Sequence, residues 1–307
     1  MSVALLPPSL QPGECIGIIA PGGQIRNLPP LEQGISILQE MGFEVRLPRR
    51  LWPGTGYLAD TDRNRALEFH KMWADPEISV ILALRGGFGC LRLLHLLDRR
   101  VLRQHAKLLI GFSDITILHQ ALYQTTQMIS LHGPMLTTLS SSSRESVERL
   151  YACLRGNWKF PVHSSMIEVL RGGHPARGTL LGGNLSSLMS LLATPWERDW
   201  TDAILFLEDV GEPLYRIDRM LTQLAHCGKL SQVRGIILGD FSLTRDQDHL
   251  ERLRFHEQIW KRVLELTEST GIPVWGDFPV GHGRDNHTLP HGAEAVMDSR
   301  QATLSFC

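Results

Sequence analysis

Three short stretches of the sequence contain the residue types that a nucleophilic catalytic site needs. The first, KLLIGFSDITILHQAL at residues 107–122, leaves an apolar run at Gly111, presents Ser113 and Asp114, and then becomes apolar again. A serine just before an apolar-periodic run is a good helix N-cap, and on local grounds the pattern favours that role. A serine at a sharp turn between a strand and a helix can instead act as a nucleophile, although G-x-S-D is not the G-x-S-x-G motif.

The second stretch, GHGRDNHTLPHG, supplies candidates for the base that a nucleophilic serine requires, namely His282, His287 and His291. Its glycines and Pro290 indicate an irregular loop, without the helical spacing or the carboxylate of a H-E-x-x-H site. We therefore expect neither a metal ion nor another cofactor. His282 lies between two glycines, which could bring its ring close to another strand end. One or two of the three histidines are expected to be solvated loop residues.

The third stretch, AILFLEDVGEPLYRID, supplies candidates for the acid that would orient the base. Glu208 is the first polar residue after a run of five apolar residues, so we expect it to be partly enclosed. An enclosed carboxylate must be paired or hydrogen-bonded, and an imidazole N–H would serve. For Asp209 and Glu212 the simpler interpretation is a solvated strand end, although spacing alone does not choose among the three carboxylates.

Several glycine pairs follow apolar runs, and each pair has two interpretations. The segments APGG, LRGGFGC and LLGGNLSS lack the spacing and context of a dinucleotide or P-loop motif, which makes nucleotide binding a weak alternative. Gly86 and Gly87 could present a backbone N–H to an oxyanion without side-chain crowding. A tight turn between a strand and a helix explains the same two glycines at least as well. His119 and His132 are expected to pack in the interior or to support the site residues.

The order of apolar and polar segments predicts two domains. In the first half, continuous apolar strands alternate with helical stretches, which indicates a parallel sheet covered on both faces with functional groups beyond the carboxyl ends of its strands. After this half, the regular alternation of strands and helices ends. We expect a flavodoxin-like α/β domain over 1–156, a linker over 157–172 and a smaller, β-rich α+β domain over 173–307. The expected strands are CIGIIAP, EVRLP, ISVILALRGG, KLLIGFS, MISLHGP, AILFLED, VRGIILGDF and ATLSF, and the expected helices are 31–41, 62–73, CLRLLHLLD, a helix from 114, 185–192 and 217–225.

The composition excludes several classes of protein. The 307 residues are 43% hydrophobic, which is enough for two domains with substantial cores. The 31 basic and 32 acidic residues give no charged footprint for nucleic acid or for a membrane surface. The five cysteines are scattered without a C-x-x-C pair, which argues for reduced thiols in the cytoplasm. The first 21 residues lack a basic start and a long apolar run, so we expect neither a signal peptide nor a transmembrane helix.

Taken together, the motifs LRGGFGCLRLL, LIGFSDITILHQAL, LHGPM, GTLLGGNLSSLMSLLATPW, ILFLEDVGEPLYRIDRMLTQL, GIILGDF and FPVGHGRDNHTLPHG resemble those of the LD-carboxypeptidase family. This family of serine peptidases includes murein tetrapeptide carboxypeptidases and microcin-immunity hydrolases. The resemblance runs in order from IAPGG to LPHGA. It implies a flavodoxin-like N-terminal domain and a C-terminal domain rich in β structure, with the active site between them.

By motif, the resemblance assigns Ser113 as the nucleophile, Glu208 as the acid and His282 as the base, with the backbone N–H groups of Gly87 and Asp114 as oxyanion donors. It implies a metal-independent carboxypeptidase that releases terminal D-alanine from a murein tetrapeptide or a related stem peptide in peptidoglycan recycling. It also implies a homodimer. The resemblance therefore favours a catalytic role for Ser113 over a capping role, although the two roles do not exclude each other.

Two alternatives remain on the sequence alone. Phe88 stands where the family often has tyrosine, and the loop TPWERDW leaves open a hydrolase of peptidyl or aminoacyl adenylates, of the microcin-immunity type. The second alternative is a non-enzymatic α/β protein that binds phosphate or a nucleotide. For a peptidase, the carboxylate of the leaving D-alanine needs a cation, and Arg85, Arg216 and Arg284 all stand beside motifs.

Overall fold

The computed structural model describes residues 9–48, 51, 54–243 and 248–307, which form two compact units. The first unit holds the described residues up to Trp158 together with 190–197 and 287–292. The second holds 159–189, the described residues of 198–286, and 293–307. Within the range expected to be a linker, residues 162–163 and 168–171 form strands of the second unit. The expectation that the chain lacks a signal peptide rests partly on residues 1–8, which lie outside the described residues.

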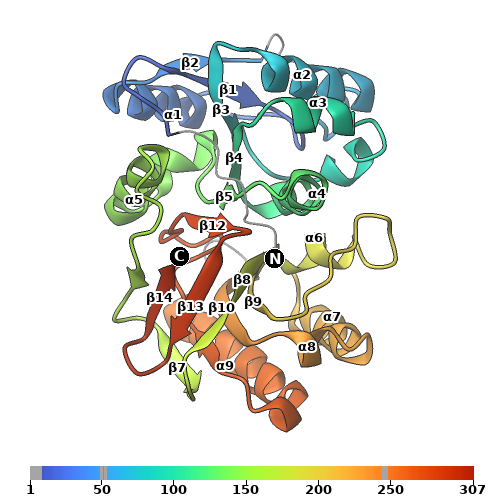
Figure 1. Cartoon of the computed structure of the whole chain (residues 1–307), viewed down its shortest axis with the longest axis vertical. Coiled ribbons are helices and arrows are strands. Elements are labelled where there is room, and N and C mark those ends of the chain that lie inside the picture. The colour runs from blue at the N-terminus through green and yellow to red at the C-terminus, as the bar shows by residue number, and fades with distance from the viewer. Residues whose placement is uncertain (1–8, 49–50, 52–53, 244–247) are drawn as a thin grey trace. The chain divides into compact units, whose positions relative to one another are not determined.

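The first unit is built on a six-stranded sheet with the order β12-β5-β4-β3-β1-β2 (Figure 1). Strands β1 to β5 run parallel, as the alternation of strands and helices predicts. The edge strand β12 comes from the C-terminal part of the chain and pairs antiparallel with β5. The strands are β1 Cys15–Ile19, β2 Glu44–Arg46, β3 Ile78–Ala83, β4 Leu108–Gly111, β5 Ser130–His132 and β12 Leu289–His291.

Apolar residues explain why this sheet lies inside its unit. The central strands β3 and β4 read ISVILA and LLIG, and nearly all of these side chains are buried. Fully buried strands of this kind suit a parallel sheet that helices cover. The helices of the unit are α1 Pro29–Glu40, α2 Asp62–Ala74, α3 Arg99–Gln104, α4 Thr116–Thr126 and α5 Arg144–Leu154. Helices α2, α3 and α4 pack apolar residues into one core with the strands, which includes Phe69, Trp73 and Leu118.

One expected helix of the first unit is wrong. The segment CLRLLHLLD forms only a short 3-10 turn, η1 Cys90–Leu93, and the chain then turns before α3 begins. The segment does not continue as one helix because its last residue, Asp98, starts a new one. The Asp98 side chain accepts a hydrogen bond from the Arg100 backbone N–H and so caps α3. The apolar residues of the segment still fill the core, which is why their spacing looked helical.

The second unit is built on an eight-stranded mixed sheet with the order β6-β14-β13-β8-β9-β10-β11-β7. The central strands β8 to β11 run parallel, and the remaining strands pair antiparallel at both edges. This arrangement confirms the expected fold class. The strands are β6 Val162–His163, β7 Glu168–Arg171, β8 Ala176–Asn184, β9 Ala203–Val210, β10 Gly235–Ser242, β11 Val274–Gly276, β13 Glu294–Asp298 and β14 Thr303–Phe306.

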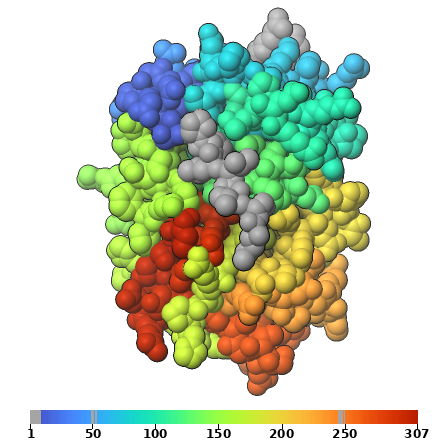
Figure 2. Space-filling view, in the orientation of Figure 1, coloured from blue at the N-terminus to red at the C-terminus, as the bar shows by residue number. Residues whose placement is uncertain are grey.

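The helices of the second unit are α6 Leu185–Met189, α7 Leu214–His226, α8 Lys229–Gln232 and α9 His249–Leu266. Helix α6 is shorter than expected, and α9 was not expected. Its side-chain cap on Asp248 and the buried residues Phe255, Ile259 and Val263 at four-residue spacing are ordinary helix signals. In Figure 2, α9 (orange) and the hairpin of β13 and β14 (red) reach the surface of this unit. Among the described residues, no helix has the length and apolar character needed to span a membrane.

Buried histidines support the first unit from inside. On α4, the His119 ring lies 2.8 Å through Nε2 from the Gly111 carbonyl oxygen and 2.8 Å through Nδ1 from Ser130 Oγ. A carbonyl oxygen only accepts, so Nε2 carries the proton and Nδ1 accepts from the serine hydroxyl. The rings of His132 and His291 lie beside His119, at centroid distances of 6.3 and 5.7 Å. The expectation that His119 and His132 pack inside is confirmed.

We predict that His119 makes the protein lose stability on acidification. Burial lowers the pKa of His119 to about 4, below the ordinary value of about 6.5 that it regains on unfolding. The unfolded chain therefore binds the extra proton first, and stability present above pH 6.5 is lost as the pH falls towards 4. Urea unfolding of the wild type should show this loss, about 2–3 kcal/mol between pH 7 and 4.5, and His119→Gln should lack it. The exposed His95→Gln is the control, and equal pH dependence in all three proteins would contradict the prediction.

Candidate active site

The turn that carries Ser113 is strained. Strand β4 ends at Gly111, and Ser113 begins the short 3-10 turn η2 Ser113–Ile115 that leads into α4. Ser113 has φ +63°, a left-handed conformation that non-glycine residues adopt infrequently and at a cost. The N-cap positions of η2 and α4 are Phe112 and Ile115, so Ser113 is not an N-cap residue and that interpretation is wrong. Strain of this kind is typical of functional turns, including the nucleophile turn of hydrolases.

Gly86 and Gly87 lie against this turn. A Cβ atom on Gly86 would be 2.9 Å from Ser113 Cβ and 3.0 Å from its Oγ, so only glycine fits there. The same point is 3.6 Å from the backbone nitrogen of Asp114. Gly87 has φ +106°, and among the described residues its N–H donates no hydrogen bond. The glycine pair therefore forms a tight turn and also brings backbone close to the serine hydroxyl, so the two interpretations of the pair are compatible.

Asp114 ties the serine turn to the glycine loop. Its carboxylate is buried, and Oδ2 accepts a hydrogen bond of 2.9 Å from the Cys90 backbone N–H, just beyond the glycine loop. Burial raises the pKa of Asp114, and the hydrogen bond from Cys90 opposes that rise. A second link comes from Gly23, whose N–H donates to the Gly86 carbonyl oxygen at 2.9 Å. The hydrogen bond from Cys90 to Asp114 thus ties the glycine loop to the serine turn.

The second unit brings Glu208 and His282 together. Glu208 is completely buried near the end of β9, and its Oε2 lies 2.6 Å from Nδ1 of His282. The carboxylate accepts, so Nδ1 carries a proton and Nε2 keeps the lone pair that a general base needs. Burial lowers the pKa of His282, but Glu208 and then Asp209 and Asp240 raise it, and the net pKa lies above its ordinary value. This is the arrangement of a histidine whose positive form is stabilised by an acid.

The residue before His282 must be glycine. Gly281 has φ +123°, and a Cβ atom there would lie 3.0 Å from Glu208 Cβ and 3.2 Å from Asp240 Cβ. Its N–H donates to Asn286 Oδ1 at 3.2 Å. The close approach of this backbone to the end of β9 is what lets the imidazole reach the buried carboxylate.

Asp209 is a correction to the sequence analysis, which expected a solvated strand end. Its side chain is buried, and it accepts hydrogen bonds from the Ser186 N–H at 2.9 Å, from Ser186 Oγ at 2.6 Å and from Asn184 Nδ2 at 3.0 Å. Burial, followed by the charge of Glu208, raises the pKa of Asp209 to about 6. Asp209 therefore anchors the start of α6. The polar run NLSS after the neighbouring strand was the signal for it. Glu212, also expected to be solvated, keeps 23% of its side chain exposed.

The remaining candidates are placed as follows. His287 and His291 are buried in the first unit, so the expectation of solvated loop histidines is wrong for both. His291 is in β12, where pairing with β5 encloses it, and His287 lies in the segment that leads into β12. Arg85 donates to the Gln24 carbonyl oxygen at 2.8 Å, whereas Arg284 is exposed. In the described part of the chain, no group of three or more histidine, cysteine, aspartate or glutamate side chains is arranged to hold a metal ion.

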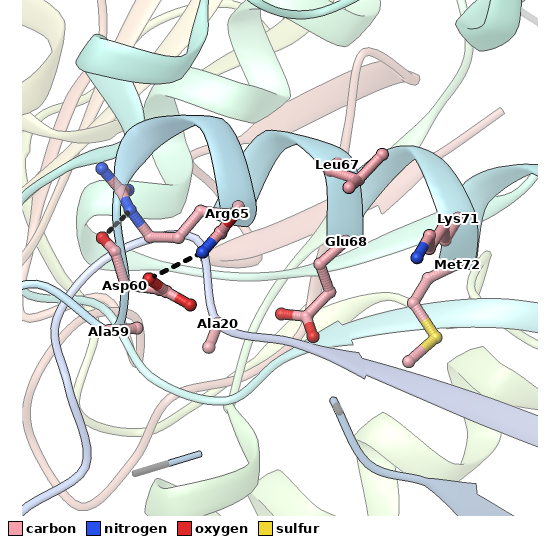
Figure 3. Close-up of a pocket in the computed structure, with 9 residues that line it drawn as sticks. Ala20, Ala59, Asp60, Arg65, Leu67, Glu68, Lys71 and Met72 are labelled. Carbon is pink, nitrogen blue, oxygen red and sulfur yellow. Dashed lines mark hydrogen bonds between the residues drawn. The ribbon is translucent and has the colours of Figure 1, made fainter. Parts of the chain in front are cut away.

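A cavity of about 360 Å³ lies along α2, apart from these candidates (Figure 3). Asp60 forms one end of it and accepts hydrogen bonds from Asn64 Nδ2 and from Arg65 Nε, both at 3.1 Å. The Arg65 guanidinium also donates to the Gly89 carbonyl oxygen at 3.1 Å. This arginine therefore braces the far side of the glycine loop, and the cavity holds none of the candidate catalytic residues. Its lining is Ala20, Ala59, Asp60, Asn64, Arg65, Leu67, Glu68, Lys71 and Met72.

Comparison with known proteins defines the class. Residues 16–133 match the LD-carboxypeptidase N-terminal domain, and residues 177–297 match the LD-carboxypeptidase C-terminal domain. Together these matches cover most of the chain, and their boundaries enclose the serine turn and the Glu208–His282 pair. The chain belongs to the LD-carboxypeptidase family, as its motifs predict.

Individual relatives cover nearly the whole chain. It is 34% identical to the murein tetrapeptide carboxypeptidase of Pseudomonas aeruginosa, over 93% of this chain and 94% of that protein. The structure of muramoyltetrapeptide carboxypeptidase from Oxalobacter formigenes is 31% identical, with a TM-score of 0.79, over 95% of this chain and 97% of that one. The MccF-like protein from Bacillus anthracis has a TM-score of 0.87 over 99% of each chain, at 24% identity, and so shares the fold.

We predict that Ser113→Gly is more stable than Ser113→Ala. Alanine must keep the left-handed conformation, which costs an L-residue about 1–2 kcal/mol, whereas glycine adopts it freely. Urea unfolding at pH 7 measures the difference. The same pair of substitutions at Ser231, in α8, is the control, and there alanine should be the more stable because it is the better helix former. If Ser113→Ala were more stable than Ser113→Gly, as expected at Ser231, the result would contradict the strained turn.

We predict that Gly281→Ala loses both stability and activity. The added methyl group meets Glu208 and Asp240, so the backbone under His282 must shift. Gly271→Ala is the matched control, since Gly271 has φ +62° but no atom near the position of a Cβ. The control should cost about 1 kcal/mol in unfolding free energy, and Gly281→Ala about 2 kcal/mol more. Equal costs, with activity kept in both variants, would show that the close approach to Glu208 is unimportant.

Proposed function

We propose that this chain is a serine carboxypeptidase that releases terminal D-alanine from murein tetrapeptides, a reaction of peptidoglycan recycling. The observation that carries the proposal is the hydrogen bond between Glu208 and His282, because it leaves Nε2 as a base. Family membership and the names of the relatives support the substrate class. The strained turn at Ser113 supports the choice of nucleophile. A homodimer and a cytoplasmic location stay predictions of the sequence analysis.

In the proposed reaction, Ser113 Oγ attacks the carbonyl carbon of the amide between the L-configured centre of the third residue and D-alanine. His282 Nε2 takes the hydroxyl proton, and Glu208 holds the ring through Nδ1 and stabilises its positive form. The imidazolium then protonates the amine of D-alanine, which leaves as the acyl-enzyme forms. Water, activated by the same nitrogen, releases the shortened peptide and restores the serine.

The oxyanion that forms in each half of the reaction needs preorganised donors. We assign the backbone N–H groups of Gly87 and Asp114 to this role. Gly86, the residue before Gly87, packs against Ser113, and Asp114 follows Ser113 in the chain, which supports the assignment. Donors of this kind contribute about 3–4 kcal/mol each to transition-state stabilisation. They lose nothing to reorganisation when the glycine loop and the turn are already fixed, as the bond from Cys90 to Asp114 indicates. Arg85, on the same loop, is the candidate for binding the terminal carboxylate.

Release of D-alanine from purified murein tetrapeptide tests the proposal. The wild type should release it with and without a chelator, and Ser113→Ala should lose at least about a thousandfold in kcat. Because the base must be neutral, kcat/KM should fall as the pH drops through the raised pKa of His282. Glu208→Gln should keep the fold and lower kcat.

Three results would count against the proposal. Full activity in Ser113→Ala, or activity removed by the chelator and restored by a metal ion, would exclude the serine mechanism. Faster hydrolysis of a peptidyl or aminoacyl adenylate than of the tetrapeptide would change the assigned substrate but not the serine mechanism. A fluorophosphonate label on Ser113 would separate both hydrolases from a ligand-binding protein.

A further inference from the structure

A second buried carboxylate, Asp240, lies beneath the turn that carries His282. Asp240 stands in β10, next to β9, and its side chain is 6% exposed. A Cβ atom on Gly281 would lie 3.2 Å from Asp240 Cβ, and one on Gly283 would lie 3.3 Å from Asp240 Oδ2. Both glycines that flank His282 therefore pack on this one residue. The proposed reaction gives Asp240 no chemical step.

Two cations of α9 surround the Asp240 carboxylate. Arg252 Nη2 lies 2.7 Å from Oδ1, and His256 Nε2 lies 3.7 Å from the same oxygen. The His256 ring faces acceptors on both sides, with Nδ1 2.7 Å from Asp277 Oδ1 and Nε2 2.8 Å from the Phe241 carbonyl oxygen. The Phe241 backbone N–H also donates to Nε2 at 3.1 Å, so both backbone groups of Phe241 hold this nitrogen.

The carboxylates around His256 favour its protonated form. Burial lowers the pKa of His256, but the carboxylates of Asp240 and Asp277 raise it, to a net value of about 9. At neutral pH the buried Asp240 therefore has one cation at its exposed side, Arg252, and another in the interior. These two cations compensate the negative charge of the buried carboxylate.

We propose that Asp240, fixed by Arg252 and His256, is a positioning residue that holds the Gly281–Gly283 turn so that His282 meets Glu208. The inference deepens the proposed function, on which it rests. Asp240 does not touch the reacting atoms. It acts through the backbone under the imidazole and through its own charge.

The charge of Asp240 also bears on the protonation of His282. The groups that act on His282 in the described part of the second unit are Glu208 and Asp209 from β9 and Asp240 from β10. Behind Asp240 stand Arg252 and His256 of α9, and their positive charges offset it. Removal of the Asp240 charge should therefore lower the pKa of His282, and removal of the Arg252 charge should raise it.

The experiment compares Asp240→Asn, which is nearly isosteric, with Arg252→Gln in the full chain. Asp218→Asn is the matched control, because Asp218 pairs with Arg262 at 2.6 Å between α7 and α9 and carries the same charge on an exposed site. Two readouts are taken: the acid limb of kcat/KM for the tetrapeptide, and NMR titration of ring-labelled histidines, with His282→Gln to assign the signal.

We expect Asp240→Asn to move the His282 titration and the acid limb to lower pH, Arg252→Gln to move both to higher pH, and Asp218→Asn to move neither. Asp240→Ala should lower kcat about ten- to a hundredfold, because the turn loses its support. Shifts in the same direction for Asp240→Asn and Arg252→Gln, or shifts no larger than in Asp218→Asn, would overturn the inference. A shifted His282 titration without any tetrapeptide hydrolysis would refute the proposed function and leave the positioning role intact. If Asp240→Ala fails to fold, the Asp240→Asn titration decides alone.

Discussion

The arrangement of the second unit depends on one buried charge. Glu208 has no exposed surface, and a carboxylate without water must find a partner or take up a proton. Its partner is the His282 ring, and the approach is possible because the neighbouring residue is a glycine with φ +123°. The packing of the Gly281–Gly283 turn on Asp240 follows from the same need. What looks like a glycine-rich loop is thus a backbone shaped around two carboxylates.

In the first unit, the surrounding contacts keep Ser113 in a backbone conformation that a serine does not favour. The residue is held from three sides: by β4, by the glycine loop against its side chain, and by the link from Asp114 to Cys90. His119, on the helix that follows, reaches back to the last carbonyl of β4 and closes the turn from inside. Strain persists only where surrounding contacts determine the backbone, and here each contact belongs to the interior rather than to solvent.

Sequence reasoning could identify the features that repeat or alternate. The five parallel strands follow from apolar runs between helical stretches, and the enclosed position of Glu208 follows from its place after such a run. It failed where distant segments decide the outcome. The burial of Asp209 depends on Ser186 and Asn184 at the end of another strand, and the burial of His291 depends on pairing with β5. The pairing of Glu208 with His282 needed the family resemblance to single it out, because a separation of 74 residues has no local signature.

The edge strand β12 has a consequence for how the protein is made. Residues 289–291 complete a sheet whose other strands all lie before residue 133, so ribosomal synthesis must deliver more than 150 further residues before β5 gains its last neighbour. Until then the nascent sheet has an unpaired border, and exposed borders of this kind recruit other chains. The topology therefore keeps this border of the sheet without its final strand through more than half of the chain's synthesis.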